Sequence, residues 1–154
     1  MPPPTLGFQE DTTLSKTQIA LIQLNEAVAL FVQEKFLPAL TLAGAAEVIL
    51  GQLLVRKGEL PSIKETTQSI ERLRQSTGLE VMRGKTEREM IDDWNRPRNN
   101  AKHLIGPEGE AFTANLCDEA YWMIRRAVEN ASKLQLSVER EQDFVNWVVI
   151  NVAA

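Results

Sequence analysis

The sequence predicts an all-α protein, a single bundle of five or six helices that are mostly antiparallel. Apolar residues recur every three or four positions through most of the chain after residue 14, which is the period of a helix with one buried face. There is no run of strict apolar–polar alternation and no hairpin dipeptide between apolar runs, so evidence for strands is poor. A chain of 154 residues is long enough for one domain with a sizeable core.

A capping signal separates the N-terminal segment from the first helix. Residues 1–13 combine proline, glycine, threonine and acidic residues, and their three consecutive prolines resist helix formation, so we expect a flexible arm. Ser15 followed by Gln18 is a capping box, and it opens the helical domain that we place at residues 14–154. Phe36-Leu37-Pro38 ends the first helix, because proline disfavours helix at the residue before it.

The second expected helix, about 38–57, is the most apolar segment of the chain. Its small residues, Gly44 and Gly51 among them, would let another helix backbone come close. Glu47 stands in the middle of this run, where a carboxylate is costly to bury without a partner. Lys57-Gly58 supplies a stop at the C-terminal end.

The second half of the chain contains two more capping boxes and an internal proline. Ser62 with Glu65 and Thr86 with Glu89 each have the spacing of a capping box. Pro97 falls inside the helix that Thr86 begins, so we expect a kink or a restart there. The expected elements are a helix through about Ser76, a linker at 79–85, a helix from Thr86, a break at Ile105-Gly106-Pro107-Glu108-Gly109, a helix at about 110–134 and a last helix capped by Ser137.

Composition narrows the classes of function. The net charge of −4 argues against a protein that coats nucleic acid, but it leaves room for a local basic site. The single Cys117 excludes an internal disulfide and fits a reducing compartment. We expect no membrane span, because no stretch of about twenty uninterrupted apolar residues occurs. Met1-Pro2-Pro3-Pro4 lacks the features of a signal peptide, so we expect a cytoplasmic protein.

The segment with the most chemical content is Arg98-Asn99-Asn100-Ala101-Lys102-His103, which contains the only histidine of the chain. Arginine keeps its charge and fits phosphate with a planar fork. Histidine readily gives or takes a proton near neutral pH. These two side chains, held together, are enough in principle to cleave RNA without a metal.

In this segment the chain resembles the HEPN superfamily, helical bundles whose motif is Arg, a polar residue, three variable residues and His. Arg98, Asn99 and His103 match that motif position by position. The resemblance implies a metal-independent endoribonuclease without a cofactor that acts on RNA. It also implies a homodimer in which two motifs meet at one composite cleft. The family suggests two contexts for such an enzyme. It could be the toxin of a toxin–antitoxin pair, with an antitoxin or regulatory protein as partner, or a component of a defence or stress response.

The implied reaction is attack of an RNA 2′-hydroxyl on the adjacent phosphorus, which leaves 2′,3′-cyclic phosphate ends. His103 would act as general base or acid, and Arg98 would stabilise the charge that develops on the phosphoryl oxygens. Asn99 would orient His103 or hold a phosphate oxygen. Lys102 and Arg96 would bind the RNA backbone, since the segment around the motif is mildly basic.

Several of these residues also have plain structural explanations. HEPN proteins often place an acidic residue on an early helix facing the motif, which makes Glu47 a candidate, but Glu47 is equally a salt-bridge partner in the core. Arg98 could be an ion-pair partner of Asp92 or Asp93. His103 could be an ordinary histidine near a helix C-terminus, which the helix dipole favours. We expect neither Arg98 nor His103 to belong to the core.

The rival function is a non-catalytic HEPN-like dimerisation or binding module, because fold does not fix function. The acidic net charge favours this module, and so does Ile105, since some HEPN toxins have tyrosine at that position. A plain helical protein with a chance motif is the third alternative. Core packing is the expected role of the three tryptophans, Trp94, Trp122 and Trp147.

Overall fold

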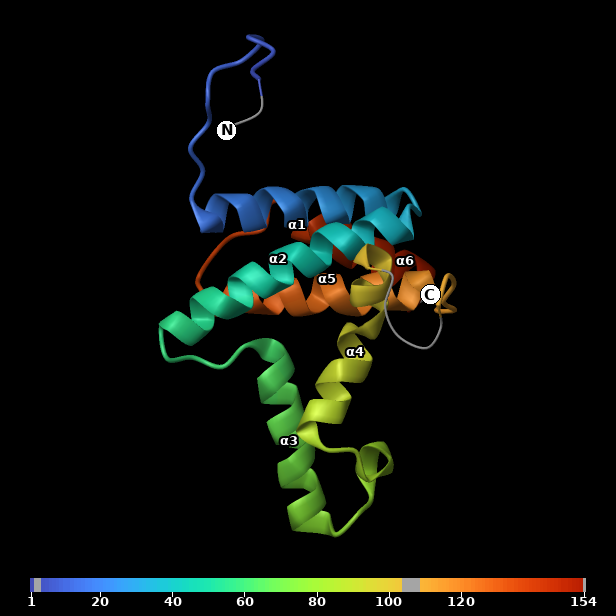
Figure 1. The fold of residues 1–154 in the computed structure, drawn as a ribbon. Coiled ribbons are helices and arrows are strands. Elements are labelled where there is room, and N and C mark those ends of the chain that lie inside the picture. The colour runs from blue at the N-terminus through green and yellow to red at the C-terminus, as the bar shows by residue number, and fades with distance from the viewer. Residues whose placement is uncertain (2–3, 104–108, 154) are drawn as a thin grey trace.

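The computed structural model describes residues 1, 4–103 and 109–153, and this part of the chain is built from helices without strands. The all-α prediction is therefore confirmed. The elements are α1 (Lys16–Val32), α2 (Phe36–Arg56), α3 (Ser62–Thr77), the short 3₁₀ helix η1 (Val81–Gly84), α4 (Glu87–Lys102), α5 (Leu116–Lys133) and α6 (Glu141–Asn151). Residues 4–13 of the N-terminal arm are exposed and form no helix, and the arm projects away from the helices (Figure 1).

The helices form a body and an extension (Figure 1). The body consists of α1, α2, α5 and α6, in which α2 packs against both α1 and α5. The extension consists of α3 and α4, which run antiparallel beside each other and protrude from the body. Because this pair carries the chain back to the end where α2 begins, α2 and α5 run in the same direction (Figure 1).

Small and large apolar residues alternate in the core. Alanines on the buried faces of α2 and α5 let these helices approach closely, and leucines fill the space between α1 and α2. Phe31 is fully buried and contacts the rings of Phe36, Phe144 and Trp147 edge to face, at centroid distances of 5.3, 5.4 and 4.6 Å. This aromatic cluster fixes α6 against α1, and it bears out core packing for Trp147.

Two of the three predicted capping boxes form. Ser15 caps α1 and Thr86 caps α4, each with the reciprocal side-chain bond. The prediction for Ser62 was wrong, because this residue lies inside the first turn of α3 after Pro61. Its backbone N–H donates to Asn130 Oδ1 at 2.8 Å, and its hydroxyl donates to Glu129. Two side chains of α5 thus replace the local cap.

Other boundaries differ from the prediction for similar reasons. The last helix begins at Glu141 rather than after Ser137, and the backbone N–H of Arg140 before it donates to Asn25 Oδ1 on α1 at 3.0 Å. The predicted helix at 110–134 was too long at its start, because Asn115 caps α5 through a bond from the Asp118 N–H at 3.2 Å.

The remaining differences concern prolines and the second break. The second helix begins at Phe36 and includes Pro38 in its first turn, where a missing N–H costs nothing. Pro97 is accommodated within α4, which continues to Lys102 without a restart. Residues 105–108 of the predicted break at 105–109 lie outside the described residues, and Ile105 is one of them.

Among the described residues, α2 is the one helix long and apolar enough to cross a membrane by length and composition alone. Its most apolar window has a mean hydropathy of 1.6, and 50% of that window is buried within the fold. Its position between α1 and α5 (Figure 1) is that of a core helix.

Leu50 and Val55 on α2 provide a matched test of this packing. Leu50 is fully buried, whereas the Val55 side chain is 61% exposed. We expect Leu50→Ala to lower the free energy of unfolding by about 2–5 kcal/mol, because it opens a cavity in the core. Val55→Ala should change it by less than about 0.5 kcal/mol. Urea denaturation followed by circular dichroism measures both, and equal effects would contradict the assignment of this face to the core.

Candidate functional site

The predicted motif occupies the C-terminal turns of α4. Residues 98–102 lie within the helix, and His103 is its C-cap, with an extended backbone. Asn99 and Asn100 do not cap a restart at Pro97. The Asn100 side chain instead donates to the Arg96 carbonyl at 3.0 Å. The helix therefore carries the motif as one continuous segment.

Arg98 is turned into the protein and paired with Glu47 of α2. Arg98 Nη1 donates to Glu47 Oε2 at 3.2 Å, and the two side chains are only 11% and 7% exposed. The expectation that Arg98 lies outside the core was wrong. The reason is that α4 packs against α2, where the buried carboxylate needs a partner.

The alternative partners of Arg98 are also excluded by the structure. Asp92 lies 3.8 Å from Arg88 one turn earlier on α4, and Asp93 pairs with Lys85. Both pairs lie on the solvent side of the helix, where ion pairs contribute little to stability.

Asn99 completes the environment of Arg98. Its Oδ1 accepts from Arg98 Nε and Nη2, both at 3.3 Å. A guanidinium has five N–H groups, and these bonds with the one to Glu47 use three of them. The other two make no hydrogen bond within the part of the chain that the structure describes.

Gly44 makes the approach of Arg98 to Glu47 possible. A Cβ atom added at Gly44 would lie 2.5 Å from both Cγ and Cδ of Arg98, far inside van der Waals contact. The arginine stem therefore lies directly on the α2 backbone one turn before Glu47. The sequence predicts that another helix comes close to α2 at Gly44, and in the structure the Arg98 side chain of α4 makes that approach.

A second guanidinium, not identified from the sequence, reaches the other oxygen of Glu47. Arg126 of α5 has its Nε 3.9 Å from Glu47 Oε1, and its side chain is 12% exposed. Its Nη2 donates to Asn95 Oδ1 on α4 at 2.9 Å and lies 3.1 Å from the sulfur of Met123. Burial lowers the pKa of Arg126, an effect that the Glu47 carboxylate opposes. The sequence did contain a signal for the burial of Arg126, because it is an arginine between Met123 and Ala127 on the buried face of a helix.

The other predicted site residues are on the surface. His103 and Lys102 are exposed at the end of α4, and Arg96 is exposed one turn earlier. The His103 backbone N–H donates to the Asn99 carbonyl at 3.0 Å. Its imidazole makes no hydrogen bond to Arg98 or Asn99 among the described atoms. The structure thus brings Arg98, Asn99 and Glu47 together, and it leaves His103 at the adjacent helix end.

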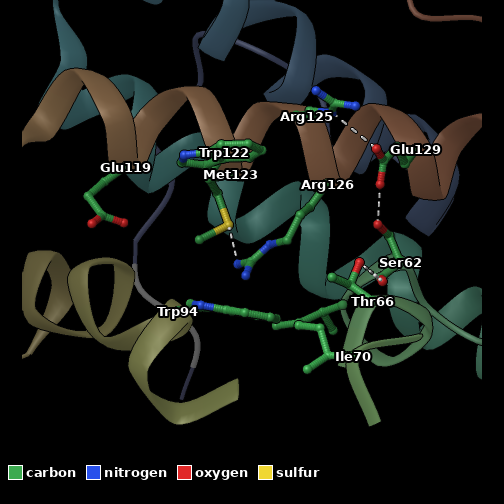
Figure 2. Close-up of a pocket in the computed structure, with 11 residues that line it drawn as sticks. Ser62, Thr66, Ile70, Trp94, Glu119, Trp122, Met123, Arg125, Arg126 and Glu129 are labelled. Carbon is green, nitrogen blue, oxygen red and sulfur yellow. Dashed lines mark hydrogen bonds and ion pairs between the residues drawn. The ribbon is translucent and has the colours of Figure 1, made fainter. Parts of the chain in front are cut away.

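A cavity of about 540 Å³ lies between α3, α4 and α5 (Figure 2). We call it the tryptophan pocket, and it is lined by Ser62, Ile63, Thr66, Ile70, Trp94, Glu119, Trp122, Met123, Arg125, Arg126 and Glu129. Trp94 and Trp122 lie on opposite sides of it, with Met123 and Arg126 between them (Figure 2). The expectation of core packing was wrong for Trp122, which is 55% exposed. The cause is that α3 and α4 diverge from the body and leave its indole at the pocket.

No protein-family model, curated protein or solved structure matches this chain. Within the described residues, no three His, Cys, Asp or Glu side chains are close enough together to hold a metal ion. The candidate site consists of the Arg98–Glu47–Arg126 cluster, the exposed His103 at the C-terminal end of the helix that contains Arg98, and the tryptophan pocket.

Two glycines of α2 test the close approach of Arg98. Gly44→Ala should lower the free energy of unfolding by about 1–3 kcal/mol, because Glu47 and Asn99 hold the arginine stem that the new methyl group meets. Gly51→Ala is the matched control, since its Cβ would meet Pro61 and Asn130 at ordinary distances of 3.5 and 3.6 Å. We expect it to be neutral or to stabilise by up to about 1 kcal/mol, as alanine does in helices. Urea denaturation compares the two, and equal stability would refute the close contact.

Proposed function

We propose that this chain is a metal-independent endoribonuclease of the HEPN type. The observation that carries the proposal is the position of Arg98, which Glu47 and Asn99 hold at the end of the helix that terminates in the exposed His103. A guanidinium fixed in this way loses no further freedom when it binds the transition state. The cluster contains two guanidinium groups and one carboxylate, so it retains positive charge for a phosphate.

The proposed reaction uses the 2′-hydroxyl of RNA as its nucleophile. An imidazole of His103 accepts the hydroxyl proton as the oxygen attacks phosphorus. The bond to the 5′-oxygen breaks, and that oxygen takes a proton from a second acid. A homodimer with two motifs at one cleft supplies a second His103 for this step. The products are a 2′,3′-cyclic phosphate and a 5′-hydroxyl.

The remaining motif residues position the substrate in this proposal. Arg98 places its two unused N–H groups on the phosphoryl oxygens. Asn99 fixes the plane of that guanidinium through its carbonyl oxygen, which leaves its amide N–H₂ for the phosphate or His103. Lys102 and Arg96, both exposed on α4, contact the neighbouring phosphates. We place this activity in the cytoplasm, where an antitoxin or regulatory protein would restrain it.

A non-catalytic dimerisation or binding module is the second candidate, and one observation favours it. Arg98 already has a structural role, because it neutralises a carboxylate that is 7% exposed. An arginine with that role would be present in a protein without catalysis.

Cleavage of labelled single-stranded RNA in EDTA tests the proposal. Wild type should cleave and leave cyclic phosphate ends, and His103→Ala should reduce the rate by about 100-fold or more, because it removes the proton acceptor. Arg88→Ala is the control, since Arg88 is an exposed arginine on the same helix, with its side chain 91% exposed. It should cleave like wild type.

Arg98→Ala is unsuitable as the main variant, because it leaves Glu47 with a single distant partner and is expected to destabilise the fold. Absence of cleavage over a panel of RNAs by folded wild type would refute the ribonuclease. If that protein were a homodimer, the binding module would replace the enzyme as the explanation.

A further inference from the structure

The tryptophan pocket has the composition of a ligand site separate from the motif. Its volume of about 540 Å³ falls in the range of about 300–1,000 Å³ typical of small-molecule sites. Its walls are largely apolar, and Ile63, Ile70 and Met123 line it together with the two indoles. Trp122 is 55% exposed, so the face of its indole is accessible to a ligand in the pocket.

Most of the polar groups that line the pocket already have partners. Glu129 accepts from Arg125 Nε at 3.2 Å and from the Ser62 hydroxyl. The Arg125 guanidinium lies over the Trp122 ring, 5.8 Å from its centroid, and also donates to the Tyr121 hydroxyl. Ser62, Glu129 and Arg125 are thus engaged with one another or with neighbouring side chains of α5.

Two charged groups in the lining have atoms without a hydrogen-bond partner in the described part of the chain. Arg126 Nε is buried, donates to no atom in the described part of the chain and lies 3.9 Å from Glu47 Oε1. Arg126 Nη1 makes no hydrogen bond in that part of the chain and is not buried, so it is the donor open to the pocket. Glu119 makes no hydrogen bond or ion pair there either, and burial raises the pKa of its carboxyl group. The pocket therefore offers a donor at its floor, an acceptor at its side and two aromatic surfaces.

This combination selects a flat ring with donors and acceptors on its edge. A purely apolar ligand would leave Arg126 and Glu119 unsatisfied, and a small anion would gain nothing from the indoles. A nucleobase uses every feature, because each base has a π-face for stacking and both donors and acceptors at its edge. Guanine fits best among the bases. Its acceptor atoms pair with the fork of an arginine such as Arg126, and its N1–H and N2–H groups can donate to a carboxylate such as that of Glu119.

We propose that the tryptophan pocket binds one unstacked nucleobase against the indoles that line it, Trp94 and the exposed Trp122. Arg126, at its floor, shares the Glu47 carboxylate with Arg98, so the pocket adjoins the motif. We further assign this base to an RNA strand whose phosphate reaches Arg98, and this assignment rests on the proposed ribonuclease function. The base-binding pocket itself does not depend on cleavage.

NMR spectra of the indole N–H groups test the pocket in His103→Ala protein, which binds without cleaving. The chain has three tryptophans, and Trp147 in the aromatic core is an internal control. Guanosine 5′-monophosphate at millimolar concentrations should shift the signals of Trp94 and Trp122 and leave that of Trp147 in place. Ribose 5-phosphate should shift none, because it has no base.

Two variants identify the contacts. Trp122→Ala should weaken nucleotide binding by about tenfold through lost stacking, and its exposed position leaves the fold intact by circular dichroism. Glu119→Gln should weaken binding by removing the charged acceptor, whereas Glu141→Gln, on the exposed start of α6, should not.

The outcomes separate the two proposals. The pocket is refuted if the nucleotide shifts neither pocket indole, if ribose 5-phosphate produces the same shifts, or if Trp122→Ala binds as wild type. An RNA tetranucleotide that binds at least tenfold more tightly than the mononucleotide identifies an RNA strand as the source of the base, and equal affinity overturns that assignment. Nucleotide binding without RNA cleavage by wild type leaves the pocket standing and removes the ribonuclease.

Discussion

The arrangement of this protein depends on one buried carboxylate. Glu47 lies in the middle of the most apolar helix, and its side chain is 7% exposed. A charge in that position is tolerated only with partners that also leave water. Arg98 from α4 and Arg126 from α5 are those partners. The requirement to neutralise Glu47 therefore fixes where α4 and α5 dock on α2, beyond what apolar packing specifies.

The same constraint relates the motif to the pocket. The carboxylate oxygens of Glu47 point to different guanidinium groups, one in the motif and one at the floor of the tryptophan pocket. Asn95 and Asn99, one turn apart on α4, each bond to one of these guanidinium groups. A ligand that binds Arg126 would therefore change the electrostatic environment of Arg98. The two proposed subsites share one electrostatic cluster.

Periodicity and capping chemistry were sufficient to predict the all-α class and the starts of α1 and α4. They failed at Ser62 and Ser137 because partners distant in sequence, Asn130 and Asn25, satisfy the backbone N–H groups at those helix starts. Local patterns contain no information about such partners. The start of α5 was missed for a different reason, since the boundary was placed at the glycine break and Asn115, a favoured N-cap residue, was not considered.

The candidate site was predictable only in part. The Arg98 motif is visible in the sequence, and Glu47 is conspicuous because a carboxylate interrupts an apolar run. Burial of Arg98 was not predictable, because periodicity assigns arginine to the surface until a buried partner is known. The exposure of Trp122 depends on how α3 and α4 leave the body (Figure 1), which no helical pattern encodes. Arg126 was missed although its position between Met123 and Ala127 places it on the buried face of α5.

A double-mutant cycle in urea denaturation tests the central role of Glu47 most directly. Its four proteins are wild type, Glu47→Gln, Arg98→Met and the double variant. If the two side chains form the buried pair that docks α4, their coupling free energy should reach about 1 kcal/mol or more, with the double variant more stable than the sum of the single losses implies. Additivity within about 0.5 kcal/mol would contradict the account, because it would mean that Glu47 and Arg98 do not depend on each other.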